Sequence, residues 1–491
     1  MVKKEAKFGK RPEVALVINE KGLNYTDMPP FSPHERYPEY RFDHVQSKFN
    51  AVYDSVRKMF IKLEYDKENF GKQSWNPLKE FVSPGQKVVI KPNWVFHQTN
   101  LGLSFSGMIT HSSIIRPILD YAIIALKGKG QIIIGDAPIQ SADFSGILAK
   151  SEIESVVSFL RERSGIDIKI EDFRREITMI KDNLVVDRIF EHGSDFIAVN
   201  LRGKSFLSPI SNDYRNFRVT NYDKDKMVKY HNERDHIYVI HQTILEADAV
   251  ISLPKLKSHR KAGLTCCLKN SVGINCQKDC LPHHRKYSVE EGGDAYRKAS
   301  FLKRIKEHLY EKFDKTHSLT AQQSYLFFIR VLNWLIKILS IENDFEGSWY
   351  GNDTVWRTIL DINRILFFAD SEGRVHEEPQ RKLLYLVDGI VAGEREGPLE
   401  PTNRHLGLMA VGENPLDVDL AISRIIGVDY TKIPSLDQAV RTSFLWDSAK
   451  DVGDLSVCYN NNDIRLDEFD LNLHLEPSAG WKGHIELDTH R

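Results

Sequence analysis

Short apolar runs that end in polar residues constrain the fold of this chain more than any other feature. The run Lys87–Ile90 ends in Lys-Pro-Asn, and the run Gln131–Gly135 ends in Asp-Ala-Pro. Between them, residues 110–130 place serines ahead of an apolar segment and two glycines behind it, which predicts a helix. Strand, helix and strand in this order form a β–α–β unit, and such units build parallel sheets through right-handed crossovers.

Strand-like runs of the same kind recur later in the chain, at Ala249–Leu253, Leu383–Val387 and His405–Gly412. The Asn-Pro-Leu-Asp sequence at 414–417 then places an N-cap residue, a first-turn proline and an acid where a helix would begin. We therefore predict an α/β fold: a mostly parallel sheet with flanking helices, in two α/β lobes, with a helical insert and an irregular N-terminal extension.

The length of 491 residues favours more than one folding unit, because single cores rarely grow so large. Composition shifts along the chain predict five regions. They are an N-terminal extension (1–84), a first α/β region with an anion-site motif (85–274), a helical insert (275–350), a second α/β region (351–450) and a strand-like tail (451–491).

The overall composition indicates a globular protein of the cytoplasm. A net charge of −1 gives no general attraction to nucleic acid, so we expect no nucleic-acid partner. The five cysteines form no disulfide-like pattern, which favours a reducing compartment. The N-terminal residues lack the apolar core of a signal peptide, and no run of about eighteen uncharged apolar residues predicts a transmembrane helix.

Positive charge is concentrated after one predicted strand, in the stretch LPKLKSHRKAGLTCCLKN at 253–270. From Lys255 to Lys286 the chain has eight lysines and arginines and a single acid, Asp279. Ligands of parallel sheets bind beyond the carboxyl ends of the strands. Residues 262–265 resemble a helix start near Gly263, and helix N-termini bind anions. The stretch therefore predicts an anion site without a Walker pattern; the alternative is a solvated basic loop.

The residues after each predicted strand supply the candidate site. We expect an anion to be held by four lysines and oriented by two asparagines: Lys91, Lys255, Lys257, Lys269, Asn93 and Asn270. Proton transfer is assigned to His259, His111 and Asp136. Asp388 and Glu394 are predicted to bind a divalent metal or to act as a base. The alternative is that proline, glycine and aspartate at these positions only end strands.

A second stretch, the predicted helix at 325–340, is apolar nearly all round. Its polar residues form one narrow stripe, Arg330, Asn333 and Lys337. Such a helix is buried, or it lies against a membrane surface or a partner protein.

With these motifs the chain resembles the DUF362 family, a domain of unknown function, from about residue 85 to 440. The resemblance rests on five sequence pieces. They are Ile90-Lys91-Pro92-Asn93; Thr110-His111-Ser112 with Ile134-Gly135-Asp136; the segment Ile251–His259; Gly263-Leu264-Thr265 with Leu268-Lys269-Asn270 and Gly273; and Asp388-Gly389-Ile390 with Gly393, Glu394, Gly397-Pro398 and the segment Asn414–Asp419. The chain departs from many relatives in its insert at about 275–350 and in having no iron–sulfur motif.

The resemblance implies an α/β fold more than an activity, and it leaves the cofactor open. The layout is also similar to nickel-pincer-dependent lactate-racemase-like proteins, but their motif set is incomplete here and no catalytic residue is carried over. We expect a DUF362-type enzyme that acts on an anionic small molecule, phosphorylated or carboxylated, by isomerisation through proton abstraction or by metal-assisted transfer. The alternative is a non-catalytic binding or assembly protein that docks to a membrane surface or a biosynthetic partner through helix 325–340.

Overall fold

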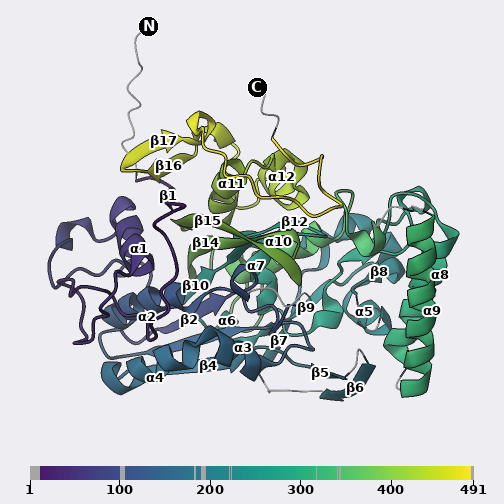
Figure 1. The fold of residues 1–491 in the computed structure, drawn as a ribbon, viewed down its shortest axis with the longest axis horizontal. Coiled ribbons are helices and arrows are strands. Elements are labelled where there is room, and N and C mark those ends of the chain that lie inside the picture. The colour runs from purple at the N-terminus through teal and green to yellow at the C-terminus, as the bar shows by residue number, and fades with distance from the viewer. Residues whose placement is uncertain are drawn as a thin grey trace, which may run out of the picture.

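A computed structural model gives the fold for residues 11–99, 105–181, 184–189, 195–220, 222, 224–316, 318–339, 341 and 344–487. An eleven-stranded sheet forms the centre, with nine strands in the order β17-β16-β1-β15-β14-β10-β2-β3-β4 and with β11 and β12 attached at β14 (Figure 1). These strands are β1 (Val14–Ile18), β2 (Lys87–Pro92), β3 (Gln131–Asp136), β4 (Asp167–Asp172), β10 (Ala249–Leu253), β11 (Lys255–His259), β12 (Gly263–Thr265), β14 (Lys382–Glu396), β15 (Glu400–Gly412), β16 (Ser456–Tyr459) and β17 (Asn462–Arg465).

The strands from β4 to β14 run parallel, as the β–α–β pattern predicts. Neighbouring pairs β4–β3, β3–β2, β2–β10 and β10–β14 are all parallel, whereas β15 joins β14 antiparallel. The predicted α/β fold with a mostly parallel sheet is thus confirmed. Both predicted α/β regions contribute to this one sheet, because β10 of the first pairs with β14 of the second. The five region boundaries stay a prediction.

Helices cover both faces of the sheet. Successive residues of a strand point to opposite faces, and in the central strands both sets are apolar, so both faces need a cover. Val88 and Ile90 belong to a core with the helices α1, α2 and α4, and Val89 belongs to a second core with α10 and α11. The helices are α1 (Ala51–Lys62), α2 (Ser112–Leu126), α3 (Phe144–Ser151), α4 (Ile153–Ser164), α5 (Lys224–Tyr230), α6 (Gln242–Leu245), α7 (Cys267–Asn270), α8 (Phe301–Lys315), α9 (Leu319–Ile338), α10 (Val355–Phe368), α11 (Pro415–Ile425) and α12 (Pro434–Arg441).

The predicted insert contains the helices α8 and α9, which lie side by side at one edge of the molecule (Figure 1). Short antiparallel strand pairs lie between them and the large sheet. They are β5 (Ile177–Lys181) with β6 (Leu184–Ile189), β7 (Phe196–Asn200) with β9 (Ile237–His241), and β8 (Phe217–Arg218) with β13 (His284–Arg285). Within the described residues, no helix is long and apolar enough to cross a membrane.

Segments from the N-terminal and the C-terminal part of the described chain join the large sheet. The predicted N-terminal extension contributes β1, which pairs with β15 and with β16. Within the predicted strand-like tail, the strands β16 and β17 form a hairpin at Ser456–Arg465.

One predicted helix start is wrong. Residues 263–265 form the strand β12, which pairs antiparallel with β11, and Gly263 has a φ of +75° that favours glycine. A Cβ at Gly263 would also lie 2.5 Å from the Ile433 side chain. The turn therefore needs glycine for both space and backbone conformation, and the helix α7 begins only at Cys267.

Candidate functional site

A cavity of about 780 Å³ lies beyond the carboxyl ends of β2 and β3, where the topology of a parallel sheet places ligands. Its cationic side is lined by Lys91, Lys257, His259, Lys261, Lys269, Lys278 and His283. Its apolar side comes from β5, β6 and the helical insert and includes Ile180, Val185, Tyr310, Phe313, Leu326 and Phe345. The cavity therefore combines a cationic side with a largely apolar one.

Seven of the residues predicted from strand ends line this cavity: Lys91, Asn93, Asp136, Lys257, His259, Lys269 and Asn270. The other four, His111, Lys255, Asp388 and Glu394, are not part of the lining. The structure therefore brings together the residues that follow β2 and β3 with those of β11 and α7.

A buried ion pair links the ends of β2 and β3. Lys91 Nζ lies 2.8 Å from Asp136 Oδ1, and the other carboxylate oxygen accepts a hydrogen bond from Trp94 N at 2.7 Å. Gly273 lets the backbone pass beside this pair, since a Cβ there would lie 2.1 Å from Asp136 Oδ1. Both oxygens of Asp136 are thus engaged, which suits holding Lys91 in place better than proton transfer.

Two asparagines hold Lys257 at the cavity. Lys257 Nζ donates to Asn93 Oδ1 at 2.7 Å and to the Met108 carbonyl at 2.6 Å. Asn93 Nδ2 donates in turn to Asn270 Oδ1 at 3.0 Å. Burial, helped by the positive charges of Lys255 and Lys269, moves the pKa of Lys257 well below its ordinary value.

Four lysines of the lining, Lys257, Lys261, Lys269 and Lys278, have no carboxylate within 4.0 Å among the residues that the structure describes. Lys261 Nζ donates to Thr220 Oγ1 at 2.6 Å and Lys278 Nζ to the Asn275 carbonyl at 3.0 Å. Burial, followed by neighbouring cations, lowers the pKa of Lys269 to about 7. Burial also lowers the pKa values of Lys261 and Lys278 to about 8.

Two histidines of the lining have opposite hydrogen-bonding character. His259 Nδ1 accepts from the backbone N–H groups of Lys261 and Ala262, each at 3.1 Å, so its proton resides on Nε2. His283 Nδ1 lies 2.7 Å from the Leu281 carbonyl and donates to it, which leaves Nε2 as an acceptor. Burial moves the pKa of both rings well below the ordinary value. Neutral His259 is thus a donor and neutral His283 an acceptor.

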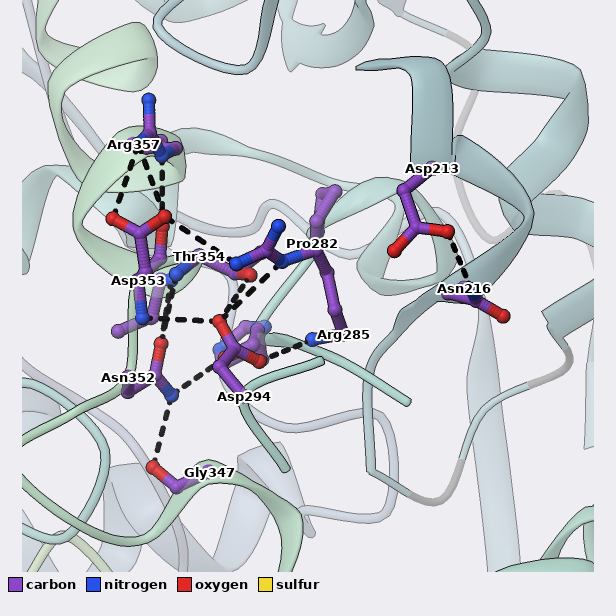
Figure 2. Close-up of polar contacts among 12 residues, drawn as sticks. Asp213, Asn216, Pro282, Arg285, Asp294, Gly347, Asn352, Asp353, Thr354 and Arg357 are labelled. Carbon is purple, nitrogen blue, oxygen red and sulfur yellow. Dashed lines mark hydrogen bonds and ion pairs between the residues drawn. The ribbon is translucent and has the colours of Figure 1, made fainter. Parts of the chain in front are cut away.

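A polar cluster around Asp294 (Figure 2) fixes the backbone from His283 to Arg285. The Asp294 carboxylate accepts from Arg285 N, from Asp353 N at 3.0 Å and from Thr354 Oγ1 at 2.6 Å. Asn352 Nδ2 donates to the His283 carbonyl at 2.9 Å. Burial raises the pKa of Asp294 to about 6. Strand β13 and the His283 carbonyl are therefore held by the residues that precede helix α10.

A second buried network contains three of the four predicted residues that lie outside the lining. Lys255 Nζ lies 3.1 Å from Asp388 Oδ2, and it donates to Tyr25 OH at 2.6 Å. Tyr25 OH donates to Asp388 Oδ1 at 2.5 Å, and His111 N donates to the other oxygen at 3.0 Å. The His111 ring stacks on Tyr25 and caps α2 through Nδ1. This network ties the N-terminal segment to β11 and β14.

The two residues predicted to bind a metal, Asp388 and Glu394, lie in different surroundings. Asp388 is fully buried in the network with Lys255, whereas Glu394 is half-buried and accepts from Glu476 N at 3.4 Å. In the described part of the chain, three potential ligand atoms come within 4.8 Å of one another at Cys266, Cys267 and Asp419. Both Asp419 oxygens already accept the backbone N–H groups of Cys267 and Leu268, at 2.7 and 3.0 Å.

This capping aspartate also corrects the prediction of an anion at a helix start near Gly263. The helix begins four residues later, and the N–H groups of its first turn bind the carboxylate of Asp419. The anion-binding capacity of the segment therefore lies in its lysine side chains. Sequence reasoning did not place Lys261, Lys278 or His283 in the site, although the excess of positive charge between residues 255 and 286 was the signal for them.

Comparison with known proteins supports the resemblance seen in the motifs. Residues 203–424 match the family model described as a domain of unknown function, DUF362. This part of the chain is therefore similar to the DUF362 family. The match includes β11, α7 and His283, and Lys91 and Asp136 lie before it. The DUF362 segment thus supplies most of the cationic lining, and the β–α–β unit before it supplies the rest.

No curated protein matches the chain. Among solved structures, a crystal structure of a protein from Thermotoga maritima is similar at 12% sequence identity with a TM-score of 0.30. The similarity covers 73% of this chain and 54% of that one, so the chain spans about half the length of that protein.

Proposed function

We propose that the protein is a DUF362-type enzyme that binds an anionic small molecule, phosphorylated or carboxylated, in the cavity at the sheet ends. The observation that carries the proposal is the set of four cavity lysines without a carboxylate partner among the described residues. Their lowered pKa values reflect first the cost of holding a charge away from water and then the neighbouring cations. A bound anion would offset this cost.

The lysines and asparagines divide the binding of the anion between them. Lys261, Lys269 and Lys278 would contact its oxygens, because their amines reach the cavity and Lys269 has no other partner within the described residues. Lys257, held by Asn93, would supply positive charge from the base of the cavity. Lysine suits this role as a point charge for phosphate or carboxylate oxygens.

The reaction that we propose is proton abstraction, as in an isomerisation. His283 Nε2 would accept a proton from the bound molecule, and His259 Nε2–H would donate a hydrogen bond or a proton to an oxygen on it. Opposed tautomers of two neutral rings support this assignment, since one must accept while the other donates. Metal-assisted transfer remains the alternative chemistry.

Thermal unfolding in the presence of inorganic phosphate, pyrophosphate and citrate tests the anion site. We expect these anions to raise the melting temperature of the wild type. In the double variant Lys269→Met with Lys278→Met, each lost charge-assisted contact costs about 1.5–3 kcal/mol, so binding weakens by a factor of ten or more. The exposed control Lys129→Met keeps the wild-type shift. Equal shifts in wild type and double variant would remove the basis for the proposal.

The cytoplasmic location also stays a proposal. It is supported by the five cysteines, which are all free and buried.

A second candidate function is the docking of the protein through the predicted helix 325–340. One observation favours it: α9 exposes a set of large apolar side chains along this segment, including Phe327, Trp334 and Ile338. Docking does not exclude an enzymatic function, because these exposed side chains are not part of the cavity lining.

A further inference from the structure

The helix α9 carries an unusual surface for a helix at the edge of a globular protein. Phe327, Trp334 and Ile338 are 61%, 60% and 56% exposed, and Phe328 and Val331 are exposed beside them. Single exposed apolar residues are common, but a contiguous set on one helix face marks an interaction surface.

Helical geometry places these side chains on one face. Phe327, Val331, Trp334 and Ile338 follow one another at spacings of four, three and four residues, which is the period of one helix face. We call these four residues, together with Phe328, the apolar stripe. At a rise of about 1.5 Å per residue, the stripe is roughly 16 Å long.

The opposite face of α9 is fixed to the protein. Gln322 accepts from Val185 N at 2.9 Å and donates to the Val185 carbonyl at 3.2 Å, so the helix is tied to β6. Ile329 and Leu332 are buried on the same side, and Leu326 lines the cavity. The apolar stripe is thus presented outward from a rigid backing.

The charges around the stripe are positive. Arg330 and Lys337 are exposed along one edge of it, and α9 contains no aspartate or glutamate between Leu319 and Ile338. The exposed residues of the neighbouring helix α8 are Phe301, Arg304, His308, Lys312 and Lys315. Of these, Arg304 and Lys315 pair with Glu291 and Asp225.

We propose that α9 docks the protein on the surface of an anionic lipid bilayer, with the apolar stripe in the headgroup region and Arg330 and Lys337 against lipid phosphates. The inference deepens the second candidate function, the docking helix, and does not depend on the anion cavity. Helices that lie in a membrane interface combine an aromatic and aliphatic face with flanking lysine or arginine. Anionic lipid surfaces attract such cations.

A second copy of the chain fits this surface less well. In a symmetric dimer the same patch faces itself, so the cations beside the stripe would meet cations. Since α9 offers no acid to pair with them, charge complementarity favours an anionic partner.

Tryptophan fluorescence gives a direct test. Of the seven tryptophans, Trp334 is 60% exposed, while the other six are at most 8% exposed. We expect a blue shift of the emission when full-length protein is mixed with vesicles of phosphatidylcholine and phosphatidylglycerol. The variant Trp334→Phe should still sediment with these vesicles but should lose the shift. An unchanged emission spectrum of the wild type would overturn the proposal.

Charge variants test whether the cations beside the apolar stripe contact the lipid headgroups. We expect Arg330→Gln with Lys337→Gln to weaken sedimentation with anionic vesicles about fivefold for each cation removed. The control pair Lys127→Gln with Lys129→Gln removes the same charge from exposed positions elsewhere and should bind as the wild type does. High salt should weaken the binding of the wild type.

The possible outcomes distinguish the lipid proposal from the general docking function of α9 and from anion binding in the cavity. Dimers that dissociate in Phe327→Ser, without vesicle binding, would overturn the lipid proposal and keep α9 as a docking surface. Monomers that bind no vesicle would overturn both. Neither result would alter the anion-induced thermal shift, which reports on the cavity alone.

Discussion

At the scale of single residues, Lys269 shows what burial does to a charge. Its ammonium group lies among Lys91, Lys261 and Lys278, which all disfavour a further positive charge. The pKa falls from 10.5 to about 7, so a large share of the molecules hold a neutral amine at neutral pH. Such an amine can bind an anion with proton uptake, since a bound anion favours the charged form.

We predict that Lys269 makes stability depend on pH. Below about pH 7 the Lys269 amine is protonated in both the folded and the unfolded state. Its buried charge then destabilises the folded state most. Between about pH 7 and 10.5 the unfolded chain binds more of this proton, so the free energy of unfolding rises with pH. From pH 7 to 9, the wild type should gain on the order of 2 kcal/mol relative to Lys269→Met.

Urea unfolding at the two pH values measures this difference. The exposed variant Lys129→Met is the control and should follow the wild type at both pH values. A difference between wild type and Lys269→Met that stays constant from pH 7 to 9 would contradict the assigned pKa.

Residue-level prediction from sequence succeeded where a strand end alone fixes the position. Lys91 and Asp136 lie at the carboxyl ends of paired strands, and parallel pairing places them at the same edge. Lys255 and Lys257 share one strand, but the pairing of β11 with β14 shifts register between them. Only Lys257 lines the cavity. The sequence could not show this difference, because the irregularity is set by a partner strand more than a hundred residues away.

At the scale of elements, the β11–β12 hairpin and the Asp294 cluster shape the site. The hairpin carries His259 and brings Lys261 back over the cavity, where a helix would have directed both differently. The Asp294 cluster holds β13, which follows His283 directly (Figure 2). In the sequence, the acidic, glycine-bearing stretches at 290–294 and 349–353 fit cation ligands or surface turns equally well. In the structure they meet around Arg285.

We predict that Asp294→Ala destabilises the fold by about 2–4 kcal/mol, because it leaves buried N–H and O–H donors without an acceptor. Chemical unfolding measures the loss. The variant should also reduce the anion-induced thermal shift, since the backbone beside His283 loses its support. Asp213→Ala is the matched control: Asp213 accepts only from Asn216 in the same view and is less buried (Figure 2).

For the control Asp213→Ala we expect the free energy of unfolding to change by no more than about 0.5 kcal/mol, as for most surface substitutions. If Asp294→Ala unfolds at the same denaturant concentration as Asp213→Ala, the cluster does not hold the segment.

At the scale of the whole molecule, one sheet joins distant parts of the chain. Residues from β1 at Val14 to β17 at Arg465 share it, so no predicted α/β region has a sheet of its own. The cores on its two faces contain four of the five cysteines, and Cys280 is buried outside them. Burial raises the pKa of the Cys266 thiol to about 12 and that of Cys458 to about 11, which suppresses the reactive thiolates.

We predict that a thiol reagent such as Ellman's reagent labels none of the cysteines in the native protein and all five after unfolding. Absorbance at rising denaturant concentrations measures the transition, which should coincide with unfolding followed by circular dichroism. Rapid labelling of one or more thiols in native protein would show that a core face is open to solvent.

The sequence by itself determined the fold class, the order of strands and helices in the β–α–β unit, and the family. These follow from local periodicity and from residues that end strands, and neither needs distant contacts. It also located the excess positive charge, because charge is a property of composition.

Only the tertiary structure decided which charged groups face a shared cavity and which are paired in the interior. Lys255 meets Asp388 across 133 positions of sequence, and Asp419 caps a helix that begins at Cys267. Desolvation and pairing depend on what surrounds a side chain in three dimensions, so the sequence could name the lysines but not their partners.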